Sequence, residues 1–236
     1  MKNKLNIDIY ADGAYVEEIQ ELKDKYQIAG ITTNPTLMAK AGVTNYLDFA
    51  QKMIKVADGL PISFEVFADD FDEMYEQAKI LSMLGDNVYV KIPITNTLGE
   101  FSYNVIEKLN RENVQLNITA IFTFEQLASL YTYINYTTDC IISIFAGRIS
   151  DVGYNAEIYI KYAIDVFKDK TNAKILWAST REIYNIVQAD DLGCHIITVP
   201  NNMLPKLADF GKDLAEFSLE TVKMFRNDAL KSGLSI

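Results

Sequence analysis

The sequence contains few of the residues that build metal and redox sites. It has one histidine, His195, and two cysteines, Cys140 and Cys194, in 236 residues. One histidine cannot supply a histidine-rich metal cluster, and both cysteines lie in apolar, strand-like runs typical of reduced core thiols. The segment CHIITVP around His195 also looks like a strand, so we interpret this histidine as a packing or surface residue. We expect no metal and no cofactor.

Basic residues are also scarce relative to acidic ones. The chain has 22 lysines and arginines against 32 aspartates and glutamates, a formal net charge of −10. This balance disfavours a general nucleic-acid binder, which needs a basic face. It still allows small anionic substrates, because a local pair of arginines can override a diffuse negative field.

Long apolar runs are missing as well. The opening segment MKNKLNIDIYAD has no continuous apolar stretch of the kind found in secretory signals. No run elsewhere approaches the length needed to span a bilayer. We therefore expect a cytoplasmic enzyme with neither a nucleic-acid nor a membrane partner.

Short strand-like runs alternate with longer helix-like segments, with no linker between them. The candidate strands are residues 5–11, 28–32, 61–66, 88–92, 113–118, 140–144, 174–178 and 194–199. Helical spacing of apolar residues marks 14–22, 69–84, 97–109, 123–133, 155–167 and 212–230. Eight alternating units predict an α/β fold, a single (β/α)8 TIM barrel. The predicted domain covers 1–236, with the barrel at about 5–210 and an extra C-terminal helix at about 212–232. An open doubly wound sheet is the alternative, but its Gly-rich dinucleotide turn is not found.

Polar side chains recur at alternate positions near the strand ends. In residues 113–119, Asn117 and Thr119 share one face, and the apolar residues share the other. Helices cover the outside of a barrel, so the polar face should point into its mouth, where such barrels place their chemistry. The other strands end similarly, with Asp12, Thr32 and Asn34, Ser63 and Glu65, Tyr89 and Lys91, Ser143 and Phe145, and Trp177 and Ser179.

Lys91, in the run NVYVKIPIT, is the most unusual of these residues. An ammonium group is rarely buried in an apolar strand. Facing inward and partly desolvated, the lysine could act as a free amine that forms a Schiff base with a carbonyl substrate. The alternatives are a lysine that snorkels to the surface and a purely structural ion pair with Glu65. Glu65 is also the natural general acid or base, and Thr119 could hold a water against it.

Other polar residues could bind a substrate. Its hydroxyl groups would be bound by Asp12, which could also deprotonate them, and by Asn34 and Asn117. Two arginines, Arg148 in FAGRIS and Arg181 in WASTREI, follow late strands. Loops after late barrel strands often bind phosphate, which guanidinium groups contact bidentately. Ser179, at the head of the next helix, could join them.

Five motifs resemble the transaldolase family, specifically its short branch, which also contains fructose-6-phosphate aldolases. They are IAGITTNPTL (28–37), VKIPIT (90–95), LNITAIF (116–122), ISIFAGRISD (142–151) and WASTRE (177–182). The resemblance runs from about residue 6 to the last helix. It implies a (β/α)8 barrel that acts on sugar phosphates in the pentose phosphate pathway. It also implies a homo-oligomer, a pentamer or decamer.

The resemblance further implies a role for each matching residue. Lys91 matches the Schiff-base lysine, and Glu65 and Thr119 match the pair that holds a catalytic water. Asp12 matches the carboxylate that acts on the C4 hydroxyl. The residues expected to bind substrate are Thr32, Asn34, Asn117, Ser143 and Phe145, and those expected to bind phosphate are Arg148, Ser179 and Arg181.

Two activities compete within the short branch. Fructose-6-phosphate aldolases have glutamine at the position of Glu65 and tyrosine at that of Phe145, whereas this chain resembles transaldolases at both. Phenylalanine cannot donate a proton, so proton transfer would run through Glu65 and a water. We therefore favour dihydroxyacetone transfer, in which sedoheptulose 7-phosphate and glyceraldehyde 3-phosphate give erythrose 4-phosphate and fructose 6-phosphate. The alternatives are an aldolase that releases free dihydroxyacetone and a non-enzymatic sugar-phosphate-binding scaffold.

Three residues depart from the family pattern. Gly13 stands where a small hydroxyl residue is usual, Ile144 stands where proline is common, and Thr180 replaces a frequent aromatic residue. None removes the lysine, the carboxylates or the arginines, so these departures bear on substrate fit.

Overall fold

The structure is a computed structural model that describes residues 5–233. It consists of two units, Leu5–Leu204 and the part of Pro205–Ile236 that ends at residue 233. The first unit is the barrel, and the second contains the long helix α10 (Leu214–Ser232). The prediction of one domain over 1–236 stays a prediction, and residues 1–4 and 234–236 lie outside the described residues.

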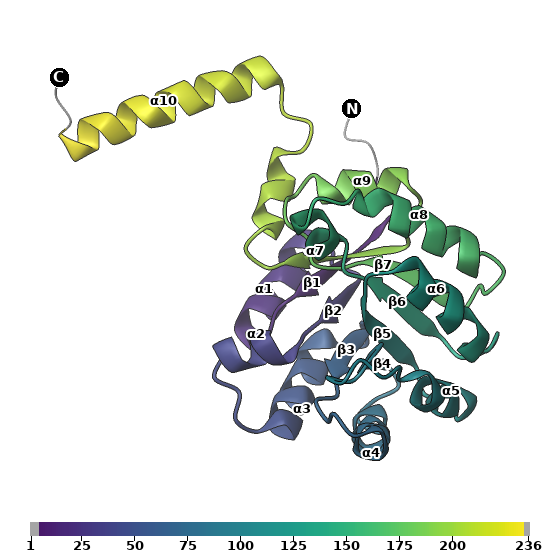
Figure 1. Cartoon of the computed structure of the whole chain (residues 1–236). Helices are drawn as coiled ribbons and strands as arrows, with labels where there is room; N and C mark the ends of the chain where they lie inside the picture. Colours follow the sequence, from purple (N-terminus) through teal and green to yellow (C-terminus); the bar gives the residue numbers. More distant parts are fainter. Residues whose placement is uncertain (1–4, 234–236) are drawn as a thin grey trace. The chain divides into compact units, whose positions relative to one another are not determined.

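Eight parallel strands close into a barrel in chain order, and β8 pairs with β1 (Figure 1). The strands are β1 (Asp8–Asp12), β2 (Gly30–Thr32), β3 (Ile62–Glu65), β4 (Val88–Pro93), β5 (Leu116–Ile121), β6 (Cys140–Ile144), β7 (Ala173–Trp177) and β8 (Ile196–Pro200). Each overlaps a predicted strand. The predicted (β/α)8 barrel is therefore confirmed, and the open sheet is wrong.

Helices surround the barrel (Figure 1). They are α1 (Val16–Tyr26), α2 (Pro35–Lys40), α3 (Tyr46–Ala57), α4 (Phe71–Ser82), α5 (Tyr103–Arg111), α6 (Phe124–Leu130), α7 (Ala146–Asp151), α8 (Ala156–Phe167) and α9 (Asn185–Asp191), with a short 3-10 turn η1 (Tyr131–Tyr133). A second 3-10 turn, η2 (Leu204–Asp209), begins at the last residue of the barrel unit. All six predicted helical segments contain a helix. The prediction for 97–109 begins too early, because that helix starts only at Tyr103.

Two hydrogen bonds that the Asp69 carboxylate accepts explain the late start of α5. The backbone N–H and the hydroxyl of Thr97 donate to the carboxylate oxygens of Asp69, each at 2.7 Å. Gly99 has a φ of 81°, and Thr95 pairs with Phe101 in an antiparallel bridge. Such contacts offer the backbone an alternative to the helix. The segment after β4 is therefore a loop at the barrel mouth.

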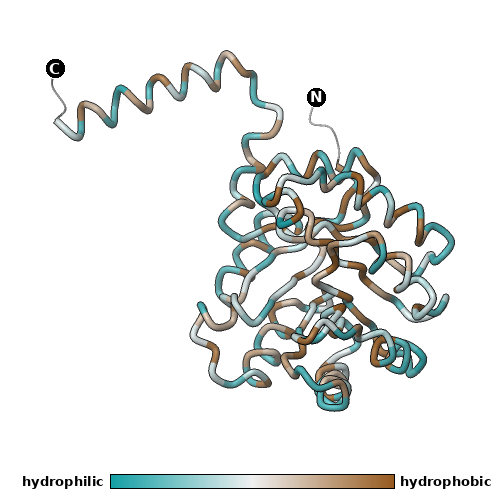
Figure 2. Tube along the Cα trace, in the orientation of Figure 1, coloured by the Kyte–Doolittle hydropathy of each residue, from teal (hydrophilic) through white to brown (hydrophobic). Residues whose placement is uncertain are grey.

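The main core lies between the strands and the helices, and a smaller cluster fills the inside of the barrel. Brown, hydrophobic segments run along the strands in Figure 2, whereas the helices alternate brown and teal. The outward-facing Val90 and Ile92 of β4 are fully buried. The inner cluster consists of Tyr10, Ile141, Leu176, Ala178 and Ile196. Chemistry inside the barrel is thereby confined to its C-terminal mouth.

Strand β7 does not have the predicted inward face. Leu176 lies opposite Ser143 in register and therefore shares its inward direction. Trp177 consequently faces outward, among residues of α8 and α9. The prediction that Trp177 points into the mouth was wrong, because both residues at the end of β7 are large and apolar and the alternation alone does not identify the inner one.

The cysteines and the histidine have the predicted packing roles. Both cysteines are buried free thiols, and burial raises the pKa of Cys194 to about 12. His195 Nδ1 accepts the backbone N–H of Ile175 at 3.0 Å, and burial lowers the pKa of the imidazole.

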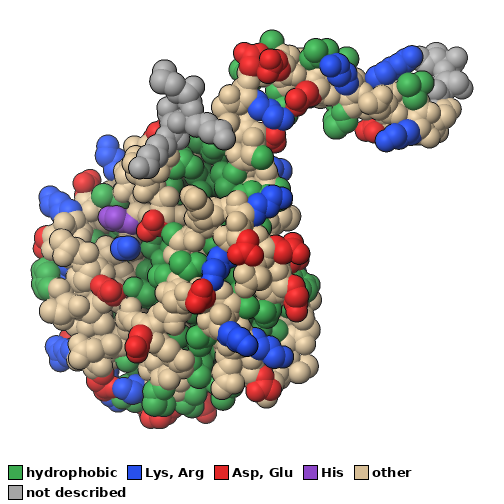
Figure 3. All heavy atoms as spheres, turned by 180° about the vertical axis from the view of Figure 1, so that it is seen from behind, with side chains coloured by type: hydrophobic (Ala, Val, Ile, Leu, Met, Phe, Trp, Pro, Cys, Tyr) green, Lys and Arg blue, Asp and Glu red, His purple; other side chains and the backbone are tan. Residues whose placement is uncertain are grey.

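On the face seen in Figure 3, acidic and basic side chains are interspersed. Within residues 5–233, no helix has both the length and the apolar character needed to cross a membrane.

Candidate functional site at the barrel mouth

Lys91 is the centre of a polar cluster at the mouth of the barrel. Its side chain comes from β4 and only 7% of the residue is exposed. Lys91 Nζ lies 3.0 Å from Glu65 Oε2 and donates to the backbone oxygen of Thr33 at 3.2 Å. Glu65 is the register partner of Lys91 across β3 and β4. The lysine therefore does not snorkel to the surface.

These partners allow the ammonium group to be buried. A buried charge is tolerated when it is both paired and hydrogen-bonded, and Lys91 has a carboxylate and a carbonyl oxygen. The strand end that carries the carboxylate is itself fixed, because the Tyr46 hydroxyl donates to the backbone oxygen of Glu65 at 2.7 Å. The pair places a proton acceptor within reach of the amine.

Asp12 ends β1 in a partly buried position beside this pair. Its Oδ1 accepts a hydrogen bond from Thr32 Oγ1 at 2.9 Å, and Thr32 is in turn hydrogen-bonded to Thr198 of β8. Burial raises the pKa of Asp12 above its ordinary value, whereas the Lys91 charge and the Thr32 hydrogen bond lower it; the Glu65 charge adds to the rise. Asp12 is therefore a carboxylate with increased proton affinity, as a general base requires.

Asn117 of β5 lies opposite Lys91 in register and is held by two hydroxyl groups. Its Nδ2 donates to Ser63 Oγ at 2.9 Å, and Ser143 Oγ donates to its Oδ1 at 2.6 Å. All three residues are buried. Because the amide nitrogen carries two hydrogens, one N–H remains for a ligand.

Thr119 and Asn34 differ in how their polar groups are used. Thr119 is buried, and its hydroxyl has no hydrogen-bond partner in the part of the chain that the structure describes. Buried polar groups usually have a hydrogen-bond partner, so a water or a substrate oxygen would supply the one that the Thr119 hydroxyl lacks. The Asn34 side-chain oxygen accepts the N–H of Leu37 at 3.0 Å and caps α2. Only its NH2 group is left for a substrate.

The predicted phosphate-binding residues come from helix α7 and the loop after β7. Ser179 lies in that loop and does not head a helix as predicted, because α9 begins only at Asn185. Gly147 allows α7 and the loop to approach, because a Cβ there would lie 1.6 Å from the backbone oxygen of Ser179. The Arg181 Nε donates at 3.0 Å to both carboxylate oxygens of Asp151. The Arg148 guanidinium lies 5.3 Å from the centre of the Phe145 ring. The Arg181 hydrogen bonds, and then the Arg148 charge, lower the pKa of Asp151, so both arginines act on one carboxylate.

The three departures from the family pattern have local explanations. At Gly13 a Cβ would lie 2.3–2.9 Å from side-chain atoms of Asn201, which occupies that space. The Thr180 hydroxyl donates to the backbone oxygen of Thr198 at 2.7 Å and so ties the loop after β7 to β8. Ile144 is fully buried.

Three participants were not predicted from the sequence. Thr198 could have been found, because the alternation in the predicted strand at 194–199 places it on one face with Ile196. Asp151 lies in the quoted ISIFAGRISD motif, but no spacing rule marks it as a partner of Arg181. Thr33 contributes a backbone oxygen, for which no side-chain pattern exists.

Together these observations define a (β/α)8-barrel protein with a buried lysine–carboxylate centre at its mouth. The sequence profile of the family described as Transaldolase/Fructose-6-phosphate aldolase matches residues 9–236. The chain belongs to this family.

Curated relatives agree with this assignment. A protein from Listeria monocytogenes named "Probable transaldolase 2" is 35% identical over 200 residues, which cover 84% of this chain and 87% of the relative. A protein from Thermoanaerobacter sp. named "Probable transaldolase" is 33% identical over 228 residues, which cover 96% of this chain and 99% of the relative. The similarity therefore extends over most of both chains.

Solved structures share the fold at low sequence identity. A putative dihydrodipicolinate synthase family protein from Coccidioides immitis has a TM-score of 0.58 at 10% identity, covering 84% of this chain and 68% of that one. A mutant tryptophan synthase α-subunit from Pyrococcus furiosus has a TM-score of 0.57 at 13% identity, covering 93% and 97%. These similarities concern the barrel architecture alone.

The hydrogen bond from Thr32 to Asp12 leads to a testable prediction. Thr32→Val should raise the pKa of Asp12 further, because the hydrogen bond stabilises the charged carboxylate. A carbon-13 NMR titration of the carboxyl groups measures this pKa. Thr132→Val, an exposed change in η1, is the control and should leave it unchanged. An unchanged or lowered Asp12 pKa in Thr32→Val would contradict the assignment.

Proposed function

We propose that this chain is a class I transaldolase that transfers a dihydroxyacetone group through a Schiff base on Lys91. The proposed reaction converts sedoheptulose 7-phosphate and glyceraldehyde 3-phosphate into erythrose 4-phosphate and fructose 6-phosphate, in the cytoplasm. The observation that carries the proposal is the buried Lys91 Nζ, 3.0 Å from Glu65 and close enough to Asp12 to affect its pKa. The family and the names of the curated relatives support it.

Schiff-base formation requires the lysine to lose a proton. In the proposed mechanism, the Lys91 ammonium passes a proton to Glu65 Oε2, and the free amine attacks the ketose carbonyl. Glu65 then returns the proton to the departing hydroxyl group, and water leaves as the C=N bond forms. Thr119, with its uncommitted hydroxyl, would hold the water that relays these protons.

Carbon–carbon cleavage requires a base at the C4 hydroxyl. Asp12 would take that proton, and the C3–C4 bond would break. The electron pair of this bond would enter the iminium and give an enamine on Lys91. The aldose phosphate leaves, an acceptor aldehyde enters, and Asp12 returns its proton to the new hydroxyl. The free N–H of Asn117 would hold the intermediate, because Ser63 and Ser143 fix its amide. Hydrolysis of the new Schiff base then frees the product.

The phosphate group of the substrate would bind beside the two arginines. Arg148 contacts an aromatic ring and has its guanidinium group at an exposed position. Arg181 would be held in place by Asp151, which leaves part of its fork for the phosphate. Ser179, whose backbone oxygen nearly touches Gly147, lies where the loop after β7 meets α7.

The second candidate is an aldolase that releases free dihydroxyacetone. That activity requires efficient protonation of the enamine. The Phe145 ring, which packs against Phe122 with centroids 5.6 Å apart, cannot supply a proton. Protonation would have to come from Glu65 through a water, so an acceptor aldehyde can intercept the enamine first. This observation favours transfer.

Glu65→Gln separates a catalytic role from a merely structural one. Glutamine keeps the shape but cannot accept the Lys91 proton, so transfer from fructose 6-phosphate to erythrose 4-phosphate should fall roughly 10²–10⁴-fold. Chromatographic detection of sedoheptulose 7-phosphate measures transfer, and a coupled assay detects free dihydroxyacetone. Glu76→Gln, on the exposed surface of α4, is the matched control. Undiminished transfer in Glu65→Gln would remove this carboxylate from the mechanism, and dihydroxyacetone as the main product of the natural sequence would favour the aldolase.

We also propose that the chain forms a homo-oligomer, a pentamer or decamer by family resemblance. Helix α10 carries apolar residues, including Phe217, Val222 and Phe225, and none of its residues is buried. A single helix cannot bury its own apolar side chains, so a second copy would provide the partner surface. Sedimentation velocity of the full chain should show a species of at least five subunits, and Phe225→Glu should weaken it. A monomer at micromolar concentration would contradict the proposal.

A further inference from the structure

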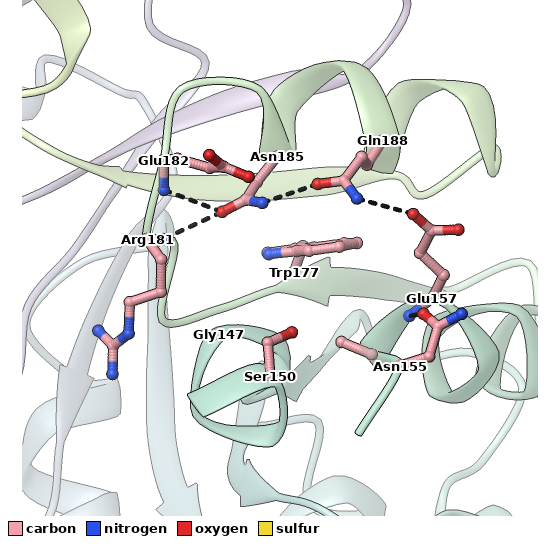
Figure 4. A pocket seen from close by; sticks show the side chains of 10 residues that line it. Gly147, Ser150, Asn155, Glu157, Trp177, Arg181, Glu182, Asn185 and Gln188 are labelled. Atoms are coloured by element: carbon pink, nitrogen blue, oxygen red, sulfur yellow. Dashed lines mark hydrogen bonds between the residues drawn. The ribbon is translucent and has the colours of Figure 1, made fainter. Parts of the chain in front are cut away.

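A cavity of about 160 Å³ lies outside the barrel, among α7, α8, α9 and the end of β7 (Figure 4). Its lining includes Ser150, Glu157, Trp177 and Gln188, and it does not include Lys91. Figure 4 shows Trp177 lying between Gln188 on one side and Ser150 on the other. Most of the lining residues carry polar side chains, although the cavity borders the core.

Trp177 brings an unmet hydrogen-bond donor to this cavity. It is the only tryptophan of the chain, and 2% of it is exposed. Its Nε1–H is buried and has no acceptor within residues 5–233. An indole N–H can only donate, and leaving a buried donor unpaired is unfavourable. The cavity therefore favours an occupant that offers an acceptor.

A chain of hydrogen bonds forms the opposite wall (Figure 4). The Asn185 side-chain oxygen accepts the backbone N–H groups of Arg181 and Glu182, and its Nδ2 donates to Gln188 at 2.8 Å. Gln188 Nε2 then donates to Glu157 Oε1 at 2.7 Å. These contacts fix both amides and hold the Glu157 carboxylate at the cavity, where its Oε2 can accept a further hydrogen bond.

The charges around the cavity disfavour an anion. Arg181 is paired with Asp151, and the remaining part of its fork is assigned above to the substrate phosphate. Neither Glu157 nor Glu182 forms a salt bridge in the part of the chain that is described. A second negative group would be repelled by these carboxylates. An uncharged molecule that both accepts and donates hydrogen bonds fits this wall better.

The pocket is partly open to solvent, and its volume suits a small occupant. At about 30 Å³ per water molecule, 160 Å³ holds roughly five waters. That is smaller than the pockets of drug-sized ligands, which begin at about 300 Å³. A molecule with three carbons and several hydroxyl groups has a suitable size, and each hydroxyl can both donate and accept.

We propose that this cavity is a binding site for a small, uncharged polyol of three-carbon size. One hydroxyl oxygen of the ligand accepts the Trp177 N–H, and another hydroxyl donates to Glu157 Oε2. The cavity does not include Lys91, although Arg181, which is proposed above to hold the substrate phosphate, lies at its edge. Loss of the Schiff-base chemistry would therefore leave this proposal untouched.

The single tryptophan makes a direct experiment possible. A nitrogen-15-labelled sample of the full chain gives one indole cross-peak, which reports on this cavity alone. Glycerol is the probe, because it has no carbonyl group and cannot form a Schiff base with Lys91. We expect a saturable shift of the peak with a dissociation constant in the order of millimolar. Inorganic phosphate is proposed to bind at the arginines, so the control is competition: phosphate should not displace glycerol from the cavity.

Variants of the lining identify the binding contacts. Gln188→Leu removes the donor that holds Glu157 and should weaken glycerol binding about tenfold. Ser150→Leu fills the cavity from α7 and should abolish the saturable shift. Gln51→Leu, the same change at an exposed position of α3, should bind as the natural sequence does. Because Ser150 makes none of the hydrogen bonds in the wall, its variant tests the proposal even if Gln188→Leu does not fold.

Three results would overturn the proposal. A shift that grows linearly with glycerol, without saturation, would mean that the cavity holds ordered water only. Displacement of bound glycerol by inorganic phosphate would make the cavity an anion site. Equal glycerol binding by Ser150→Leu would place the ligand elsewhere.

Discussion

The polar mouth of this barrel depends on one interaction, the pairing of Lys91 with Glu65 in a nearly buried position. A charge with so little access to water is tolerated only where its partners are fixed, and here both partners are. The register of β3 and β4 sets the carboxylate opposite the ammonium, and the backbone oxygen of Thr33 accepts a hydrogen from it. The Lys91 charge then lowers the pKa of Asp12 against the effect of burial. The proton affinities of the site are thus coupled.

Closure of the barrel brings the other groups to this pair. Because β8 pairs with β1, Thr198 reaches Thr32, which donates to Asp12. The adjacent strand β5 supplies Asn117, whose amide is fixed by two hydroxyl groups. Each of these side chains is oriented before any substrate arrives, which is the preorganisation that catalysis by positioned groups requires.

The sequence allowed much of this arrangement to be predicted, because strand alternation and barrel geometry together determine which side chains face the mouth. The prediction placed Lys91, Glu65 and Asn117 correctly on inward faces. It failed at Trp177, because the strand end there is apolar on both faces and only pairing with β6 identifies the inner residue. The contact to the Thr33 backbone oxygen depends on tertiary geometry that no residue pattern records. The Asp151–Arg181 pair likewise depends on the close approach of α7 and the loop after β7 at Gly147.

The central claim is that Lys91 forms the covalent intermediate, and trapping with borohydride tests it most directly. Incubation with fructose 6-phosphate and borohydride should reduce the Schiff base and add a stable mass, which peptide mass spectrometry should locate on Lys91. Lys170 is an internal control, because it is also buried but its Nζ is held by the backbone oxygen of Ile134. The account predicts an adduct on Lys91 and none on Lys170. No adduct, or an adduct on a different lysine, would contradict it.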